Sequence, residues 1–230
     1  MDLQDGVSAE AVGSERIGVT KCRHPWYFEH MNEYFVRQQL RPTTQAAEGL
    51  PRWRWTVAEM ERIAAGGFFC DHDQFELIGG EMVPMMSPAG RRHETIRLEL
   101  ARRMSRLASD AVMVASEPQF NLALDTFVKP DILVHPYAIK SYDLRGADAW
   151  LAIEVAETSL SYDLKTKRPL YASHGVPEYW VINAATLMTT VHRQPAGDTY
   201  ADTVEVGPDT RLVPSLAPEL ALSLNELKLD

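Results

Sequence analysis

The order of hydrophobic patterns along the chain is the feature that most limits how it can fold. Between residues 111 and 157, four runs typical of β-strands follow one another with no helical pattern between them. Helical patterns flank this block at residues 92–108 and 164–173. Because strands and helices do not alternate regularly, a doubly wound fold is excluded. The order predicts the α/β class, with a mixed β-sheet flanked by helices.

Capping and turn residues set further boundaries. Thr56 and Glu59 have the spacing of a capping box, so a helix is expected to begin after Thr56. The Gly79–Gly80 pair lies between two β-prone runs and fits a two-residue hairpin turn. Asp163 is expected to cap the helix that follows it, and Gly175 is expected to end that helix. Two more strands are expected at 178–183 and 187–194.

The composition indicates a globular protein of the cytoplasm. With 230 residues, of which 45% are hydrophobic and 24% charged, the chain can bury a core. No apolar run approaches the ~18 to 20 residues of a membrane-spanning helix, and the polar start lacks a signal-peptide core. Cys22 and Cys70 lie in no motif with zinc-binding spacing, so both are interpreted as plain thiols.

The chain is expected to have three parts. Residues 1–50 form an N-terminal extension, partly disordered, with one amphipathic helix at 24–40. Residues 51–195 contain the patterned strands and helices and form the core domain. Residues 196–230 form an acidic C-terminal segment that packs on this core.

The charge distribution leaves nucleic-acid binding open. A net charge of −9 argues against a protein that holds nucleic acid by its overall charge. The predicted helix at 92–108 nevertheless has a local excess of arginine over Glu94 and Glu99. In one interpretation, these arginines contact phosphate. In the other, they form a solvated face of the helix. The arginines are Arg91, Arg92, Arg97, Arg102, Arg103 and Arg106.

Two acidic residues occur where the pattern predicts burial. Glu154 lies in the middle of the apolar run at 151–156, so its carboxylate is expected beside a packed layer. Asp131 follows Pro130 at the start of another apolar strand. In the alternative reading, Glu154 lies on a solvated strand face and Asp131 is a turn residue.

A lysine completes this set. Lys167 shares a helix face with Leu164, Leu170 and Tyr171, whereas Lys165 is expected to point outward. The alternative is a snorkelling lysine whose stem alone is packed. Two strand carboxylates and a lysine suit a phosphodiesterase that binds Mg²⁺ or Mn²⁺, because these ions prefer oxygen ligands and an ammonium stabilises charge on the phosphate. Glu76 is a candidate third carboxylate or an outward hairpin residue.

Ordered motifs over residues 53–195 resemble the bacterial Uma-two family. This family is described as endonucleases with the restriction-endonuclease-like PD-(D/E)XK fold. The segment Gly175–Val181 is the most specific part of the resemblance. The other matching motifs are Glu76–Glu81, Met86–Pro88, His93, Pro130–Ile132, Ile153–Val155, Tyr162–Asp163, Lys167 and Tyr171–Ala172.

The resemblance assigns roles to the acidic residues. Asp131 would be the acid of the PD motif, Glu154 the second acidic metal ligand and Glu76 the acid of the first hairpin. The usual motif has a lysine two residues after the second acid, where this chain has Ala156. Lys167, from the following helix, would take its place as a catalytic residue.

Two further residues would be accessory to the site. His93 matches a histidine of the family and is expected to point toward the acids, although a hydrogen-bonded core histidine is the alternative. Tyr162 lies in a matching motif on the helix that contains Lys167.

The sequence therefore predicts a Mg²⁺- or Mn²⁺-dependent endonuclease that acts on DNA as a homodimer, since cutting a duplex needs two active sites. The competing hypothesis is a nuclease-fold protein without catalysis that serves as a binding or structural module. Convergence of Asp131, Glu154 and Lys167 on one site would favour the enzyme.

Overall fold

The structure, a computed structural model, describes residues 53–69, 74–85 and 90–229. The chain divides into two compact units, Met1–Glu48 and Gly49–Asp230, and every described residue belongs to the second. The expected N-terminal helix and both cysteines lie outside the described residues. Within the described part of the chain, no helix combines the length and apolarity needed to cross a membrane.

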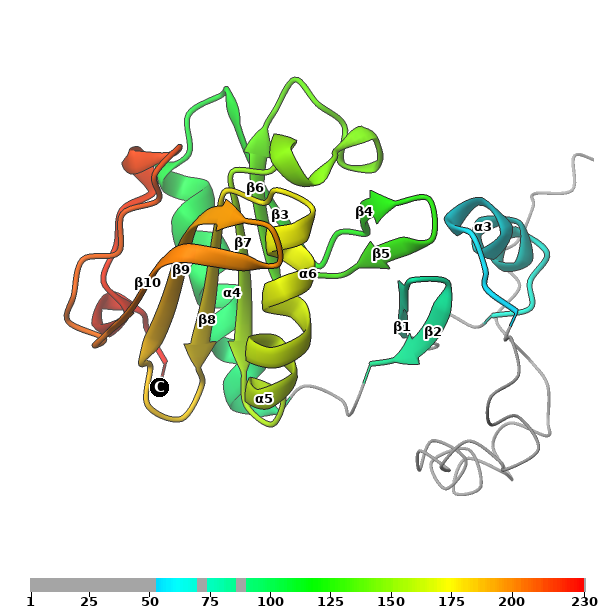
Figure 1. Ribbon diagram of the computed structural model, residues 1–230. Coiled ribbons are helices and arrows are strands. Elements are labelled where there is room, and N and C mark those ends of the chain that lie inside the picture. Colours follow the sequence, from blue (N-terminus) through cyan, green and yellow to red (C-terminus); the bar gives the residue numbers. More distant parts are fainter. Residues whose placement is uncertain (1–52, 70–73, 86–89, 230) are drawn as a thin grey trace, which may run out of the picture. The chain divides into compact units, whose positions relative to one another are not determined.

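In the described residues, ten strands form two sheets (Figure 1). The six-stranded sheet has the order β10-β9-β8-β7-β6-β3, and the four-stranded sheet has the order β2-β1-β5-β4. All pairs are antiparallel except β7 and β8, so the larger sheet is mixed, as predicted. The strands are β1 Phe75–Ile78, β2 Glu81–Pro84, β3 Val112–Ser116, β4 Phe120–Ala123, β5 Thr126–Val128, β6 Ile132–Pro136, β7 Leu151–Ala156, β8 Glu178–Asn183, β9 Thr189–Ala196 and β10 Thr199–Val206.

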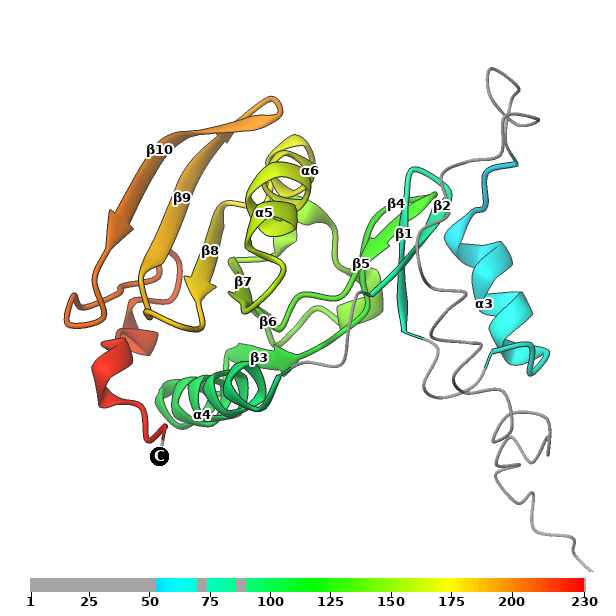
Figure 2. The ribbon, with the colours of Figure 1, turned by 90° about the horizontal axis from the view of Figure 1, so that it is seen from below.

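Helices cover both faces of the larger sheet (Figure 2). One face packs against α4, and the other packs against a continuous helical segment made of α5, a π-helical turn and α6. The helices are α3 Val57–Ala65, α4 Arg91–Leu107, α5 Leu160–Tyr162, the π-helical turn Asp163–Lys167 and α6 Arg168–Ser173. Short 3₁₀ turns are η2 Ser141–Asp143, η3 Gly146–Asp148, η5 Pro218–Leu220 and η6 Leu224–Glu226.

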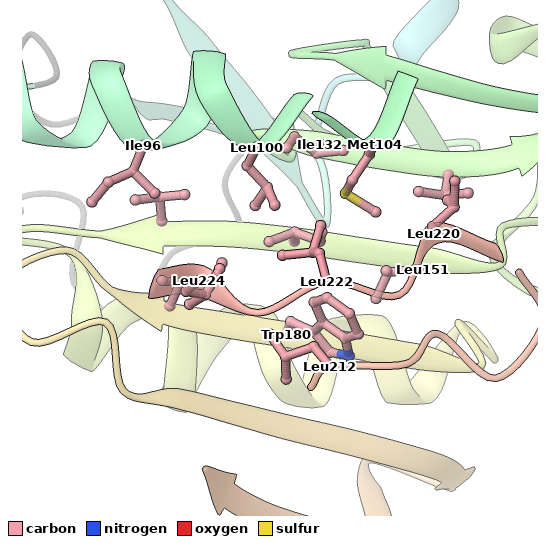
Figure 3. Packing of buried hydrophobic residues seen from close by; sticks show 14 of the residues in the cluster. Ile96, Leu100, Met104, Ile132, Leu151, Trp180, Leu212, Leu220, Leu222 and Leu224 are labelled. Carbon is pink, nitrogen blue, oxygen red and sulfur yellow. The ribbon is translucent and has the colours of Figure 1, made fainter. Parts of the chain in front are cut away.

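Successive side chains of β7 point to opposite faces of the sheet and pack in two different apolar clusters. Ile153 and Val155 pack with the apolar stripe of α4, and Trp180 of β8 joins them (Figure 3). Ala152 and Ala156 belong to the cluster that contains Tyr171 of α6. Because successive strand residues point to opposite faces, Glu154 is directed to the α5–α6 side together with these alanines. The strand thus places a carboxylate under the helical segment that contains Lys167.

The C-terminal segment contributes to the α4-side cluster. Leu212 and Leu222 pair through an isolated β-bridge and are buried with Leu220 and Leu224 (Figure 3). The expected boundary at residue 195 lies inside β9, which pairs with β10, so the sheet continues beyond it.

Several local predictions are confirmed. The capping box of Thr56 and Glu59 is formed at the start of α3. Gly79 and Gly80 have φ values of 56° and 80°, which a two-residue hairpin turn with positive φ at both positions requires. Gly175 ends the helix with a φ of 76°.

One local prediction is wrong, and two strands were not predicted. Asp163 does not cap a helix, because the helical segment begins at Leu160 and Asp163 is buried inside it. The run at 119–125 contains β4, as expected, but the short strand β5 that follows the next turn was not predicted. Strand β10 lies in the acidic segment beyond residue 195, where only short elements were expected, because an exposed edge strand needs few apolar residues.

Candidate active site

Asp131 lies at the junction of three elements. It directly precedes β6, whose Ile132 pairs with Ile153 of β7. Its Oδ2 accepts a hydrogen bond of 2.7 Å from the backbone N–H of Val155, which fixes the carboxylate beside β7. The same oxygen lies 3.1 Å from Nε2 of His93 on α4. The prediction that His93 points toward the acids is therefore confirmed.

Glu154 receives two donors from the helical segment above it. Its Oε1 accepts hydrogen bonds from Nζ of Lys167 at 2.8 Å and from the hydroxyl of Tyr171 at 3.2 Å. All three side chains are buried. The prediction that Lys167 faces inward and Lys165 outward is confirmed, since Lys165 is exposed.

Glu76 of β1 joins the site from the smaller sheet. Its Oε1 lies 2.9 Å from Nζ of Lys167 and accepts a hydrogen bond of 3.0 Å from the backbone N–H of Lys129. Its Oε2 accepts a hydrogen bond of 3.2 Å from the hydroxyl of Tyr162. With an exposure of 2%, Glu76 is not the outward hairpin residue of the alternative reading. The ammonium of Lys167 thus bridges two buried glutamates from different sheets.

The site contains more acidic than basic groups, which perturbs its protonation. Burial raises the pKa of Glu154 well above its ordinary value; Lys167 opposes this, and the carboxylates of Asp163, Asp131 and Glu76 add to it. Burial alone would lower the pKa of Lys167, but Glu154, Glu76 and Asp163 outweigh burial and its pKa is raised. Lys167 is therefore a permanent ammonium at neutral pH.

Two hydroxyls act as fixed donors. Burial raises the pKa of Tyr171 and of Tyr162, and the nearby glutamates raise both further. Both phenols therefore keep their protons and can only donate to a carboxylate. Tyr171 was expected on a packing face and in a matching motif but was not predicted as a site residue, and its hydroxyl binds Glu154.

Asp163, which was expected to cap a helix, is instead a buried acid next to Lys167. Its carboxylate is buried and accepts a hydrogen bond of 2.6 Å from the hydroxyl of Ser159. Burial raises its pKa, while Lys167 opposes the shift. It adds negative charge next to Lys167 and Glu154.

The donor chemistry of the site suits a hard divalent cation. In the described part of the chain, no three His, Cys, Asp or Glu side chains are arranged to hold a metal on their own. Mg²⁺, however, is commonly held by one or two carboxylates, with water and substrate phosphate as its remaining ligands. Asp131 and Glu154 offer two carboxylates close enough to raise the pKa of Glu154, so added positive charge would relieve their repulsion. The residues present therefore fit such an ion.

Most of the arginines of α4 have partners inside the protein. Arg97 pairs with Glu94, Arg102 pairs with Glu99, and Arg103 pairs with Glu226 of the C-terminal segment. Arg92 donates to the backbone carbonyl of Ala184 at 2.5 Å. These contacts give four of the six arginines partners inside the protein, and phosphate contact by this helix stays a prediction.

Comparison with known proteins identifies the family and the fold. The model of the Uma2 family, described as "Putative restriction endonuclease", matches residues 57–225. A crystal structure described as "a putative nuclease belonging to DUF820", from Anabaena variabilis ATCC 29413, matches with a TM-score of 0.60 and 20% identity, covering 75% of this chain and 96% of the other. No curated protein matches the sequence significantly. The predicted family resemblance and the restriction-endonuclease-like fold are confirmed.

Proposed function

The chain belongs to the Uma2 family, and we propose that it is a divalent-metal-dependent endonuclease that hydrolyses phosphodiester bonds in DNA. One observation carries this proposal: Lys167 binds the buried carboxylate of Glu154, and the carboxylate of Asp131, 36 positions before Lys167 in the chain, is bound to the backbone of Val155, the residue after Glu154. A buried lysine between acids is costly to desolvate and is weak evidence for stability alone. A scaffold that serves only as a binding module has no evident need for it.

Asp131 and Glu154 would hold the Mg²⁺ or Mn²⁺ ion, with Glu76 as a third acid behind Lys167. When bound, such an ion supplies Lewis-acid charge stabilisation for a phosphate and lowers the pKa of water. His93 orients the Asp131 carboxylate from one side, and the Val155 N–H fixes it from the other.

The protein's own groups divide the remaining work. Lys167 is a buried ammonium, so it can stabilise the negative charge that develops on the phosphate during attack. Tyr171 keeps Glu154 in place, and Tyr162 does the same for Glu76. Because both tyrosines stay protonated, neither serves as the base. The protein would act as a homodimer if it cuts both strands of a duplex.

Conservative substitutions of the acids test the proposal. Asp131→Asn and Glu154→Gln each remove a charge with little change in volume, so both variants should fold and lose Mn²⁺-dependent cleavage. The parent and both variants are assayed on plasmid, single-stranded DNA and RNA, with Mn²⁺ and with EDTA. If the parent cuts none of these substrates, the non-catalytic binding module becomes the better explanation. If both variants cut as fast as the parent, the assigned site is wrong.

A further inference from the structure

We propose that Arg97 of α4 is a positioning residue that fixes the backbone of Asp131 through the end of β3. The inference rests on the proposed function, because it concerns how Asp131 is held ready for a metal ion and a phosphate. Arg97 itself does not touch either in this assignment. Arg97 belongs to the arginine cluster of α4, which one interpretation of the sequence assigns to phosphate contact. The contacts of its side chain indicate a different role.

Arg97 is buried and uses all three guanidinium nitrogens. Nε and Nη2 donate to the carboxylate of Glu94 at 3.1 and 2.6 Å. Nη1 donates to the hydroxyl of Ser116 at 2.5 Å and lies 3.3 Å from the carboxylate of Glu117. The side chain is only 8% exposed, which leaves little of it for direct contact with DNA.

Ser116, the last residue of β3, and Glu117, which follows it, both contact Arg97 and both bind the backbone of Asp131. The hydroxyl of Ser116 donates to the Asp131 carbonyl at 3.4 Å, and the N–H of Glu117 donates to the same oxygen at 3.1 Å. The Ser116 hydroxyl can do both, since it accepts from Arg97 and donates its own hydrogen. A chain of contacts therefore runs from the guanidinium to the backbone of a proposed metal ligand.

The backbone of Glu117 shows that this junction is held in an unfavourable conformation. Its φ of 49° lies in the left-handed region, which a residue with a side chain seldom adopts. Such a conformation persists only where surrounding contacts enforce it, and strain of this kind concentrates at functional sites. The ion pair with Arg97 and the hydrogen bond to Asp131 are contacts that enforce it here.

Helix α4 consequently holds Asp131 at two points. His93 contacts the carboxylate, and Arg97, four residues later and on the same helix face, supports the backbone through β3. The guanidinium is also within electrostatic reach of Asp131. A planar group with several fixed donors can serve Glu94, Ser116 and Glu117 together, which a lysine cannot do.

The same helix provides a matched control. Arg102 pairs with Glu99 three residues earlier, as Arg97 does with Glu94, but Arg102 lies at 42% side-chain exposure. Arg97→Met and Arg102→Met therefore remove the same type of ion pair from the same helix. Neither change leaves a fully buried carboxylate, because Glu94 and Glu117 are 42% and 52% exposed.

Three measurements are made on each variant: Mn²⁺ affinity by calorimetry without DNA, kcat and KM for a cleaved DNA, and thermal stability. Arg97→Met should weaken Mn²⁺ binding and lower kcat, each by ~10-fold or more, the scale of lost outer-shell support at metal sites. KM for DNA should change little.

Arg102→Met should change none of these quantities. Ser116→Ala should weaken Mn²⁺ binding in the same direction by less, and add nothing in the Arg97→Met background.

The outcomes separate this inference from the proposed function. If the parent neither binds Mn²⁺ nor cuts DNA, the proposed function fails first. If the parent does both and Arg97→Met matches Arg102→Met, the positioning role is refuted. If Arg97→Met does not fold, Ser116→Ala decides: unchanged Mn²⁺ affinity refutes the role, and a weakened affinity at unchanged stability supports it. A higher KM with unchanged kcat would instead make Arg97 a DNA contact and overturn the inference.

Discussion

Replacing Lys167 by methionine should reveal how much of the site depends on one ammonium. The change keeps the length of the stem and removes the charge between Glu76 and Glu154, whose side chains are 3% and 7% exposed. Breaking a buried pair in this way typically costs about 3 to 5 kcal/mol, because a charge remains without its partner. Here Glu154 can take up a proton, and Tyr171 still donates to it, so we expect about 3 kcal/mol at pH 7.

The pH dependence of the stability loss in Lys167→Met follows from the same contacts. Without the ammonium, the pKa of Glu154 in the folded variant should rise further above its ordinary value, because Lys167 opposes the effect of burial in the parent. A carboxyl group whose pKa is raised by folding destabilises the fold above its unfolded pKa and has no effect below it. The difference in stability between the parent and Lys167→Met should therefore narrow as the pH falls through the raised pKa of Glu154.

Urea unfolding at pH 7 and pH 5 measures the stability gap, and cleavage with saturating Mn²⁺ measures the catalytic effect. We expect Lys167→Met to retain Mn²⁺ binding and to cut ~100-fold more slowly, the scale for losing one electrostatic stabiliser. Lys165→Met, two residues away and exposed, is the control and should match the parent. Equal stability and equal cleavage rates for Lys167→Met and the parent would refute both the buried bridge and its catalytic role.

Two other changes test the fold around the site. Burial lowers the pKa of His192 to about 4 from 6.5, so stability should fall by roughly 3 kcal/mol as the pH drops through this interval. His192→Phe should remove that slope in pH-dependent urea unfolding. A Cβ at Gly146 would lie 1.9 Å from the carbonyl oxygen of His174. Overpacking of this kind typically destabilises a fold by about 1 to 3 kcal/mol, so Gly146→Ala should lower the melting temperature by several degrees. Gly207→Ala, where a Cβ meets nothing within 4 Å, should leave the melting temperature unchanged or raised.

Local periodicity favoured burial of Glu154 and an inward direction for Lys167, but it did not predict that the two side chains pair. A strand residue flanked by apolar neighbours and a helix residue on an apolar face must both point into the protein, and here they point at each other. Glu76 could not be predicted in this way, since a four-residue hairpin strand does not show which face is buried. Its place in the site came from the family resemblance, and its contact with Lys167 supports that assignment.

The partners of the α4 arginines could not be predicted from local sequence. Arg103 pairs with Glu226, 123 residues later, and Arg92 binds the carbonyl of Ala184, 92 residues later. Nothing in the pattern of α4 indicates these partners, because each depends on how distant segments pack. Asp163 illustrates the opposite error: a residue typical of helix caps was taken for one, although the helix continues through it.

In the proposed assignment, Lys167 of the helical segment takes the place of the motif lysine that residue 156 lacks. Ala152 and Ala156 flank Glu154 on its face of β7, and their small side chains let the helix approach closely enough for Lys167 and Tyr171 to reach the carboxylate. In a regular α-helix, residues four apart are offset by about 40°, so Asp163, Lys167 and Tyr171 would drift around the axis. The π-helical turn at Asp163–Lys167 widens the helix and reduces this drift. A larger side chain at residue 156 would need the space that the helix occupies, so the alanine and the displaced lysine depend on each other.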